Sequence, residues 1–122
     1  MANSSEKPIR WLGSAKKDLL KFPDKVIRDI GYGLSLVQGG LIPDSAKVLH
    51  GLGSGVWELI ENALDGTYRA VYVVRFGNII YVLHCFQKKS KQGTTTPKPD
   101  MDLIRRRLAT AQSDYAEKHE KK

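Results

Sequence analysis

The chain has 122 residues, of which 41% are hydrophobic and 27% are charged, and this composition fits one globular domain with its own core. No apolar run approaches the ~20 residues of a membrane span, the first residues lack a secretory signal, and the single cysteine excludes an internal disulfide. We therefore predict a soluble, cytoplasmic protein without membrane contact, bound metal or cofactor. Its formal net charge of +7 suits either a polyanionic partner or plain solubility.

The N-terminal third predicts a short strand and two helices. Residues 9–12 suit an opening strand, and Ser14 stands where the N-cap of a first helix is expected. Pro23 suits the start of a second helix, whose apolar residues recur at helical spacing until a Gly-Gly pair ends it. Gly31 and Gly33 are expected to weaken this helix by about 1 kcal/mol each, unless close packing requires them.

The middle of the chain predicts a loop and a strand. Residues 41–55 carry a Pro-Asp pair and several glycines, so they form either a surface connection or the mobile rim of a site. Residues 56–61 predict the next strand, which a turn at 65–66 connects to its neighbour. Glu58 and Glu61 are too isolated to indicate a carboxylate pair, and we expect both to be solvated.

The stretch from 67 to 91 organises the rest of the chain as a β-hairpin. Residues 68–76 and 79–87 are rich in Val, Ile, Tyr and Phe, and Gly77-Asn78 between them suits a two-residue turn. Because this turn sets the register, the residues that face each other can be named in advance. The predicted pairs are Phe76–Ile79, Val71–His84, Ala70–Cys85 and Arg69–Phe86.

Alternation along both strands predicts two faces of the hairpin. One face is expected to form the core, with Cys85 as a small buried hydrophobe. Its members are Tyr68, Ala70, Tyr72, Val74, Phe76, Ile79, Tyr81, Leu83 and Cys85. The other face is expected to stay partly open. At its far end it gathers two cations, an imidazole and an aromatic ring, namely Arg69, Lys88, His84 and Phe86.

The C-terminal part predicts a basic loop and one more helix. That helix is expected to start near Thr96 or Asp100 and to carry an apolar stripe as far as Tyr115. Three consecutive arginines, 105–107, spread around the helix and cannot all face one partner.

Together these elements predict a single α+β domain over residues 1–122, with disordered ends at 1–7 and 116–122. The expected architecture is a small twisted antiparallel sheet of about four strands, with both early helices on one face and a C-terminal helix. Positive charge is concentrated at the two ends of this domain, since residues 38–87 carry three Lys or Arg against four Asp or Glu.

The stretch from 68 to 97 resembles the end of the RelE/ParE superfamily of type II toxins, and it is most similar to the phage-related HigB branch. Members of that branch show YR-x-x-Y in one strand, then H-x-F-x-K-K and a downstream Thr-Pro. The matching residues here are Tyr68, Arg69, Tyr72, His84, Phe86, Lys88, Lys89, Thr96 and Pro97. The likeness extends from about Ile9 to Leu108 and includes the segment WELI after the glycine-rich loop.

The resemblance implies a RelE-like fold and the activity of a metal-independent mRNA endonuclease that acts in the ribosome, through attack of the RNA 2′-OH on the adjacent phosphate. On this interpretation Arg69 contacts the reacting phosphate, while Lys88 and Lys89 bind phosphate or protonate the leaving oxygen. His84 either exchanges protons in the site or packs beneath it. Phe86 either stacks on a base or belongs to the core.

The remaining predictions concern further RNA contacts and partners. Four more basic side chains are candidates for RNA contact, namely Arg75, Lys91, Arg105 and Arg106. The resemblance implies a cognate helix-turn-helix antitoxin of the HigA type, with operator DNA contacted only through the toxin–antitoxin complex. Two alternatives remain: a ParE-like toxin that inhibits gyrase by binding it, and a non-catalytic module whose basic ends bind RNA. The lysine pair and His84 favour the nuclease over the gyrase inhibitor.

Overall fold

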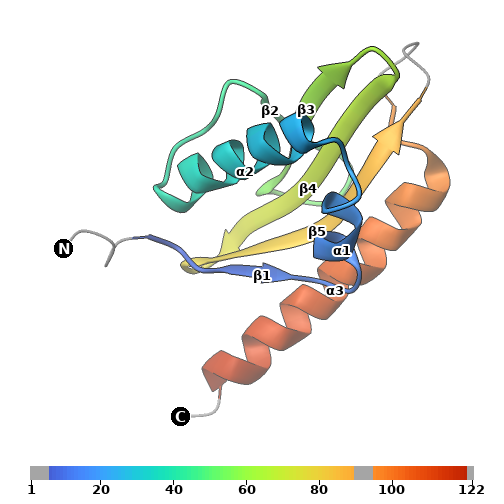
Figure 1. Cartoon of the computed structure of the whole chain (residues 1–122). Helices are drawn as coiled ribbons and strands as arrows, with labels where there is room; N and C mark the ends of the chain where they lie inside the picture. The colour runs from blue at the N-terminus through green and yellow to red at the C-terminus, as the bar shows by residue number, and fades with distance from the viewer. Residues whose placement is uncertain (1–5, 90–94, 121–122) are drawn as a thin grey trace.

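A computed structural model describes residues 6–89 and 95–120 of the chain (Figure 1). These residues form five strands and three helices. In chain order the elements are β1 (Ile9–Trp11), α1 (Ala15–Leu19), α2 (Asp24–Gln38), β2 (Ala46–Val48), β3 (Val56–Ala63), β4 (Gly66–Phe76), β5 (Ile79–Lys88) and α3 (Lys98–Glu120). None of these helices combines the length and the apolar character that a membrane span requires.

The strands form one sheet in the order β1-β5-β4-β3-β2. The predicted α+β class is confirmed, but the expectation of about four antiparallel strands is wrong in two respects. β1 lies parallel to β5, because the chain leaves β1 through two helices and has no hairpin partner for it. β2 is a further short strand within the predicted loop 41–55, where Lys47 stands opposite Glu58 of β3. The sheet is therefore mixed and has five strands.

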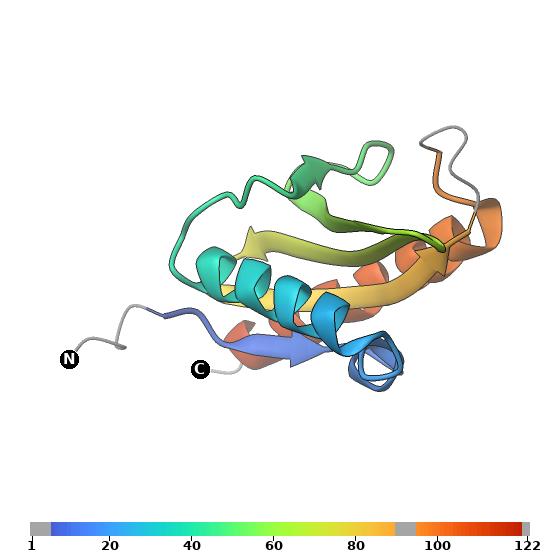
Figure 2. The same cartoon turned by 45° about the horizontal axis from the view of Figure 1, so that its top comes forward.

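The fold has three layers, with the sheet between two layers of helix (Figure 2). Helices α1 and α2 cover one face, where Ile30, Leu34 and Leu59 lie in a first buried core. Helix α3 covers the other face and forms a second core in which Ile104 and Leu108 are buried. The face that was expected to stay partly open is therefore largely closed. The reason is that the apolar stripe of α3 needs a partner, and the opposite face is already occupied.

The register of the β4–β5 hairpin matches the prediction at both ends and shifts in the middle. All four predicted pairs are present, but Tyr72 faces Val82 and Val73 faces Tyr81. Two β-bulges cause the shift, and each places two successive residues of one strand on the same side. Strict alternation therefore fails. The sequence predicted that four further residues share one face with Tyr68 and Ala70, but these four lie in the α3 core on the other face. They are Phe76, Ile79, Tyr81 and Leu83.

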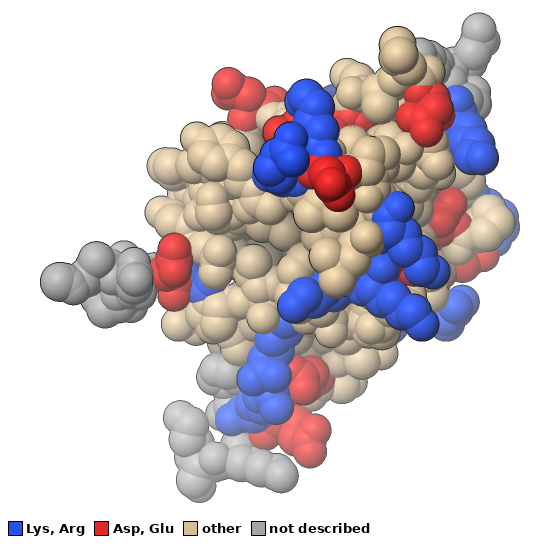
Figure 3. Space-filling view, in the orientation of Figure 1, with Lys and Arg blue, Asp and Glu red and all other residues tan. Residues whose placement is uncertain are grey.

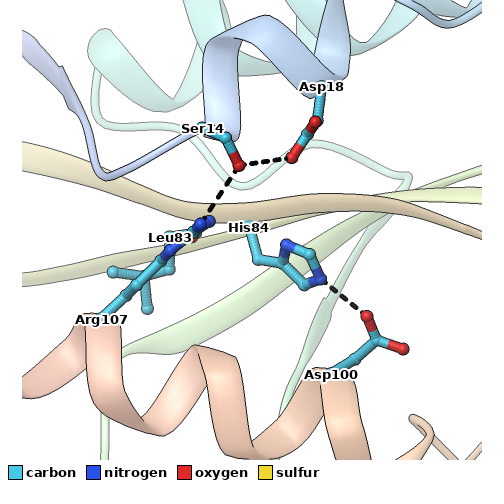
Figure 4. Close-up of polar contacts among 6 residues, drawn as sticks. All are labelled: Ser14, Asp18, Leu83, His84, Asp100 and Arg107. Carbon is cyan, nitrogen blue, oxygen red and sulfur yellow. Dashed lines mark hydrogen bonds and ion pairs between the residues drawn. The ribbon is translucent and has the colours of Figure 1, made fainter.

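Arg107 ties α3 to the rest of the molecule (Figure 4). Its Nη1 donates to the Leu83 carbonyl oxygen at 3.0 Å, and its Nη2 donates to Ser14 Oγ at 3.1 Å. Ser14 is the N-cap residue of α1, but its hydroxyl donates to Asp18 Oδ2 at 2.7 Å and makes no capping bond to the backbone. One guanidinium thus links α1, β5 and α3. Helix α3 itself continues to Glu120, whereas the sequence predicted disorder from 116.

The two glycines of α2 are expected to respond oppositely to substitution by alanine. A Cβ at Gly33 would lie 3.1 Å from both terminal carbons of the fully buried Leu59, whereas a Cβ at Gly31 has no atom within 4 Å. Gly31→Ala should therefore raise the free energy of unfolding by about 0.5–1 kcal/mol through helix propensity. Gly33→Ala should lower it by about 1 kcal/mol, because overpacking outweighs the same gain.

Urea denaturation of the two variants beside the parent protein measures both changes. Equal stabilisation by both substitutions would show that α2 is not packed closely on β3 at Gly33.

Candidate functional site

Arg69, the residue on which the nuclease prediction depends, is buried in an ion pair. Its Nη1 donates to Glu58 Oε1 at 3.2 Å, and its Nε donates to Thr67 Oγ1 at 3.4 Å. Glu58 stands opposite Val71 on β4, two residues along from Arg69, so both side chains lie on the α3 face. Arg69 is 4% exposed and Glu58 5% exposed. The expectation that Glu58 is solvated is therefore wrong, and the charge of Arg69 is balanced inside the protein.

A cleft of about 450 Å³ opens beside this ion pair, between the β2–β3 region and the start of α3. It is lined by Lys47, Val48, Leu49, His50, Glu58, Thr95, Thr96 and Met101. Because Glu58 both lines the cleft and holds Arg69, the guanidinium lies next to the cleft wall. The hydroxyl of Thr96 is buried and has no hydrogen-bond partner among the described residues. The segment 41–55 thus contributes part of the wall of a cleft.

The basic residues at the end of β5 lie next to this cleft. Lys88 stands opposite Thr67, which places it diagonally across from Arg69 on the same face of the sheet. Its Nζ donates to the carbonyl oxygen of Thr95 at 2.7 Å, one of the cleft residues. Lys89 follows and is exposed, whereas Lys91 lies outside the described residues. The structure therefore places Arg69 and Lys88 next to each other beside the cleft. Lys89 instead lies near Asp65 at the turn between β3 and β4, where its charge helps to lower the pKa of that carboxyl group.

His84 and Phe86 form a buried stack under α3. Their ring centroids are 4.8 Å apart with an angle of 15° between the planes. His84 Nε2 lies 2.7 Å from Asp100 Oδ1 in the first turn of α3 (Figure 4). Because a carboxylate only accepts hydrogen bonds, Nε2 carries the proton, and Nδ1 is buried without a partner among the described residues. This geometry favours the alternative in which both residues pack beneath the site and hold α3 on β5.

Most of the chain matches a known family. Residues 17–109 match the family described as "Phage derived protein Gp49-like (DUF891)". The chain belongs to the Gp49-like family. This is a family of RelE/HigB-like toxins, so the resemblance to the RelE/ParE superfamily is confirmed at the level of the family.

The chain is also similar to chains of known structure. The chain is similar to a chain in the crystal structure of the toxin–antitoxin complex RelBE2 from Mycobacterium tuberculosis, with 17% identity and a TM-score of 0.47. The match covers 68% of this chain and 99% of that one. No curated protein sequence matches the chain.

Three of the predicted RNA contacts of this Gp49-like protein lie away from the cleft. Arg75 is at the turn end of β4, where its Nη1 donates to the carbonyl oxygens of Leu52 at 3.3 Å and Ser54 at 2.9 Å. Arg105 and Arg106 are exposed on α3, and Arg105 Nη1 lies 3.7 Å from Asp102 Oδ1. Lys and Arg side chains form a band that crosses α1 and α3 (Figure 3). Positive charge therefore covers a wide surface and does not point to the cleft alone.

Two cleft residues of the Gp49-like chain were not singled out from its sequence. Lys47 lies on β2, and His50 is exposed at the turn that follows it. The only sequence feature that pointed to them was their position in the glycine-rich segment 41–55, for which one interpretation was the rim of a site. Among the described residues, no group of three or more His, Cys, Asp or Glu is arranged to hold a metal ion.

Proposed function

We propose that this Gp49-like protein is the toxin of a type II toxin–antitoxin system and cleaves mRNA positioned in the ribosome. The RNA 2′-OH attacks the adjacent phosphate, loses its proton to a base, and expels the 5′-oxygen, which takes up a proton. The products are a 2′,3′-cyclic phosphate and a free 5′-OH, and no metal is needed. The observation that carries the proposal is the cleft. Lys47 and His50 line it, and so do Glu58, which holds Arg69, and Thr95, whose carbonyl oxygen accepts a hydrogen bond from Lys88.

Each step has a candidate group in or beside the cleft. His50 is exposed there, and its imidazole can accept a proton from the 2′-OH or donate one to the 5′-oxygen. Lys88 and Lys89 bind the phosphate. Arg69 stabilises charge on the phosphoryl oxygens after the phosphate displaces Glu58 from its guanidinium. His84 acts by holding α3 in place and touches no RNA.

The partner proposed with this function is a cognate helix-turn-helix antitoxin of the HigA type. A free ribosome-dependent nuclease would arrest its own host, so the toxin requires an inhibitor made beside it. Operator DNA would be contacted only through the complex of the two proteins.

Expression of the chain alone is expected to arrest growth and to produce new mRNA 5′ ends within ribosome-bound reading frames. Lys89→Ala and His50→Ala should each lower the rate of cleavage about 10²-fold, because one removes a phosphate contact and the other a proton-exchanging group. Lys25→Ala, on the opposite helical layer, is the matched control and should leave cleavage unchanged. Mapping of RNA 5′ ends after brief induction measures all three.

Two other results would contradict the nuclease. DNA breaks and an SOS response with intact mRNA would indicate a gyrase inhibitor instead. Steeply salt-dependent RNA binding without a cleaved product would indicate a non-catalytic module. The non-catalytic module has support of its own, because the guanidinium of Arg69 is buried against Glu58 and is not exposed to the cleft.

A further inference from the structure

A second cleft lies on the side of the sheet that α2 covers, opposite the face of the site described above. It has a volume of about 460 Å³ and lies between α2, β3 and the segment that leads into β2. We call it the acidic groove, and its principal residues are Asp29, Tyr32, Leu41, Ile42, Asp44 and Glu61. No Lys or Arg is among the described residues that line it.

The acidic groove collects exposed apolar side chains. Tyr32 is 66% exposed, Leu41 60% and Ile42 67%. The described residues include six exposed large hydrophobic side chains, and three of the four that are at least 60% exposed line this groove. Single exposed hydrophobic residues are common, but a group beside a cleft marks a surface that binds another protein.

The carboxylates of the groove are only partly compensated. Burial, and then the nearby charge of Asp29, raise the pKa of Glu61, while Lys25 lowers it. Lys25 Nζ lies 2.7 Å from Asp29 Oδ2, but its side chain is 78% exposed. A cation placed between these carboxylates would therefore be stabilised. The protein as a whole carries a formal net charge of +7 and repels a basic partner, so the groove is its favoured contact.

We propose that the acidic groove binds a basic segment of a partner protein, which places apolar side chains against Tyr32 and Ile42 and Lys or Arg beside Asp44 and Glu61. This assignment rests on the proposed function, under which the partner protein is the antitoxin. The groove and the cleft at Arg69 lie on opposite sides of the sheet. An antitoxin that docks in the groove binds this protein without occupying the cleft.

A synthetic amphipathic helical peptide of Leu and Lys tests the groove without any assay of activity. Fluorescence anisotropy should show that the peptide binds the parent protein, while a Leu–Glu peptide of the same length does not. Ile42→Asp and Asp44→Lys should each weaken binding at least about tenfold. The matched control is Leu64→Asp, because Leu64 is 98% exposed and lies outside the groove. Unchanged affinity in both groove variants would overturn the proposal.

Growth assays test the partner. Ile42→Asp should remain toxic when expressed alone but should escape neutralisation by the product of the adjacent gene, whereas Leu64→Asp should be neutralised like the parent. Neutralisation of Ile42→Asp at the parent level would overturn the assignment of the antitoxin. If the chain is not toxic at all, the proposed function fails, and the peptide measurements still decide whether the groove binds basic segments.

A second copy of the chain is the competing occupant. Sedimentation velocity should find the parent protein monomeric at the concentrations of the peptide assay. A dimer that Ile42→Asp dissociates and Leu64→Asp does not would assign the groove to self-association and overturn the proposal.

Discussion

Arg69→Met is expected to lower the free energy of unfolding by about 3–5 kcal/mol, because it leaves the carboxylate of Glu58 buried without a partner. The two side chains are only 4% and 5% exposed, and Arg69 Nη1 lies 3.2 Å from Glu58 Oε1. Glu58→Leu is expected to cost a similar amount for the same reason. Urea denaturation at neutral pH measures each variant against the parent protein.

The double variant Glu58→Leu/Arg69→Met shows how much the intact ion pair contributes to the free energy of unfolding, separately from the cost of leaving one charge buried alone. It is expected to recover most of the lost stability, to within about 1 kcal/mol of the parent, since two apolar side chains replace two charges in a buried setting. The matched exposed pair is Lys98–Asp102, whose Nζ–Oδ2 distance is 3.0 Å. Lys98→Met should change stability by less than about 1 kcal/mol. A loss as large as that of Arg69→Met would show that burial does not set the size of the effect.

The same double variant decides whether Arg69 serves the fold or the reaction. If it is stably folded and no longer arrests growth, Arg69 contributes to the activity. If it is stably folded and as toxic as the parent protein, the proposed contact between Arg69 and the phosphate is wrong.

Raising the pH above about 10 is expected to destabilise the protein steeply, because three buried groups must release protons on unfolding. Burial raises the pKa of Tyr72 to about 12 and that of Cys85 to about 12. Burial, and then the hydrogen bond to Asp114, raise the pKa of Tyr81 to about 12. The ordinary values are 10.0 for Tyr and 9.0 for Cys.

The sign follows from the folded pKa values, which lie above those of the unfolded chain. Below about pH 8 the three groups are protonated in both states, so the stabilisation is complete, and it is lost as the pH rises toward 12. Tyr72 and Cys85 should each remove about 1.4 kcal/mol per pH unit above their unfolded pKa. The effect of Tyr81 is expected to be smaller, because its partner Asp114 is partly exposed and solvent screens the pair.

Urea titrations at a series of alkaline pH values, under reducing conditions, measure this slope. Tyr72→Phe should flatten it by about 1.4 kcal/mol per pH unit, because phenylalanine has no proton to release. Tyr32→Phe is the matched control, since Tyr32 is 66% exposed, and it should keep the parent slope. An unchanged slope in Tyr72→Phe would contradict the assignment of the alkaline transition to this group.

The candidate site was predictable only in part. The register of the hairpin places Arg69 near Lys88, as the sequence indicated, and only the structure shows that the two lie beside a cleft. The state of Arg69 was not predictable, because its partner Glu58 is on another strand and only the pairing of β3 with β4 brings them together. His50 was missed because nothing local to a glycine-rich turn indicates which cleft it will border.

What the sequence determined by itself is what short-range chemistry controls. The Gly77-Asn78 turn and the apolar periodicities specify the hairpin, the two early helices and the last one, and the motifs around Arg69 specify the family. Only the tertiary structure decided which face each residue occupies. The bulges in β4 and β5 and the docking of α3 depend on contacts between distant segments, and a shift of one residue moves every later side chain to the other face.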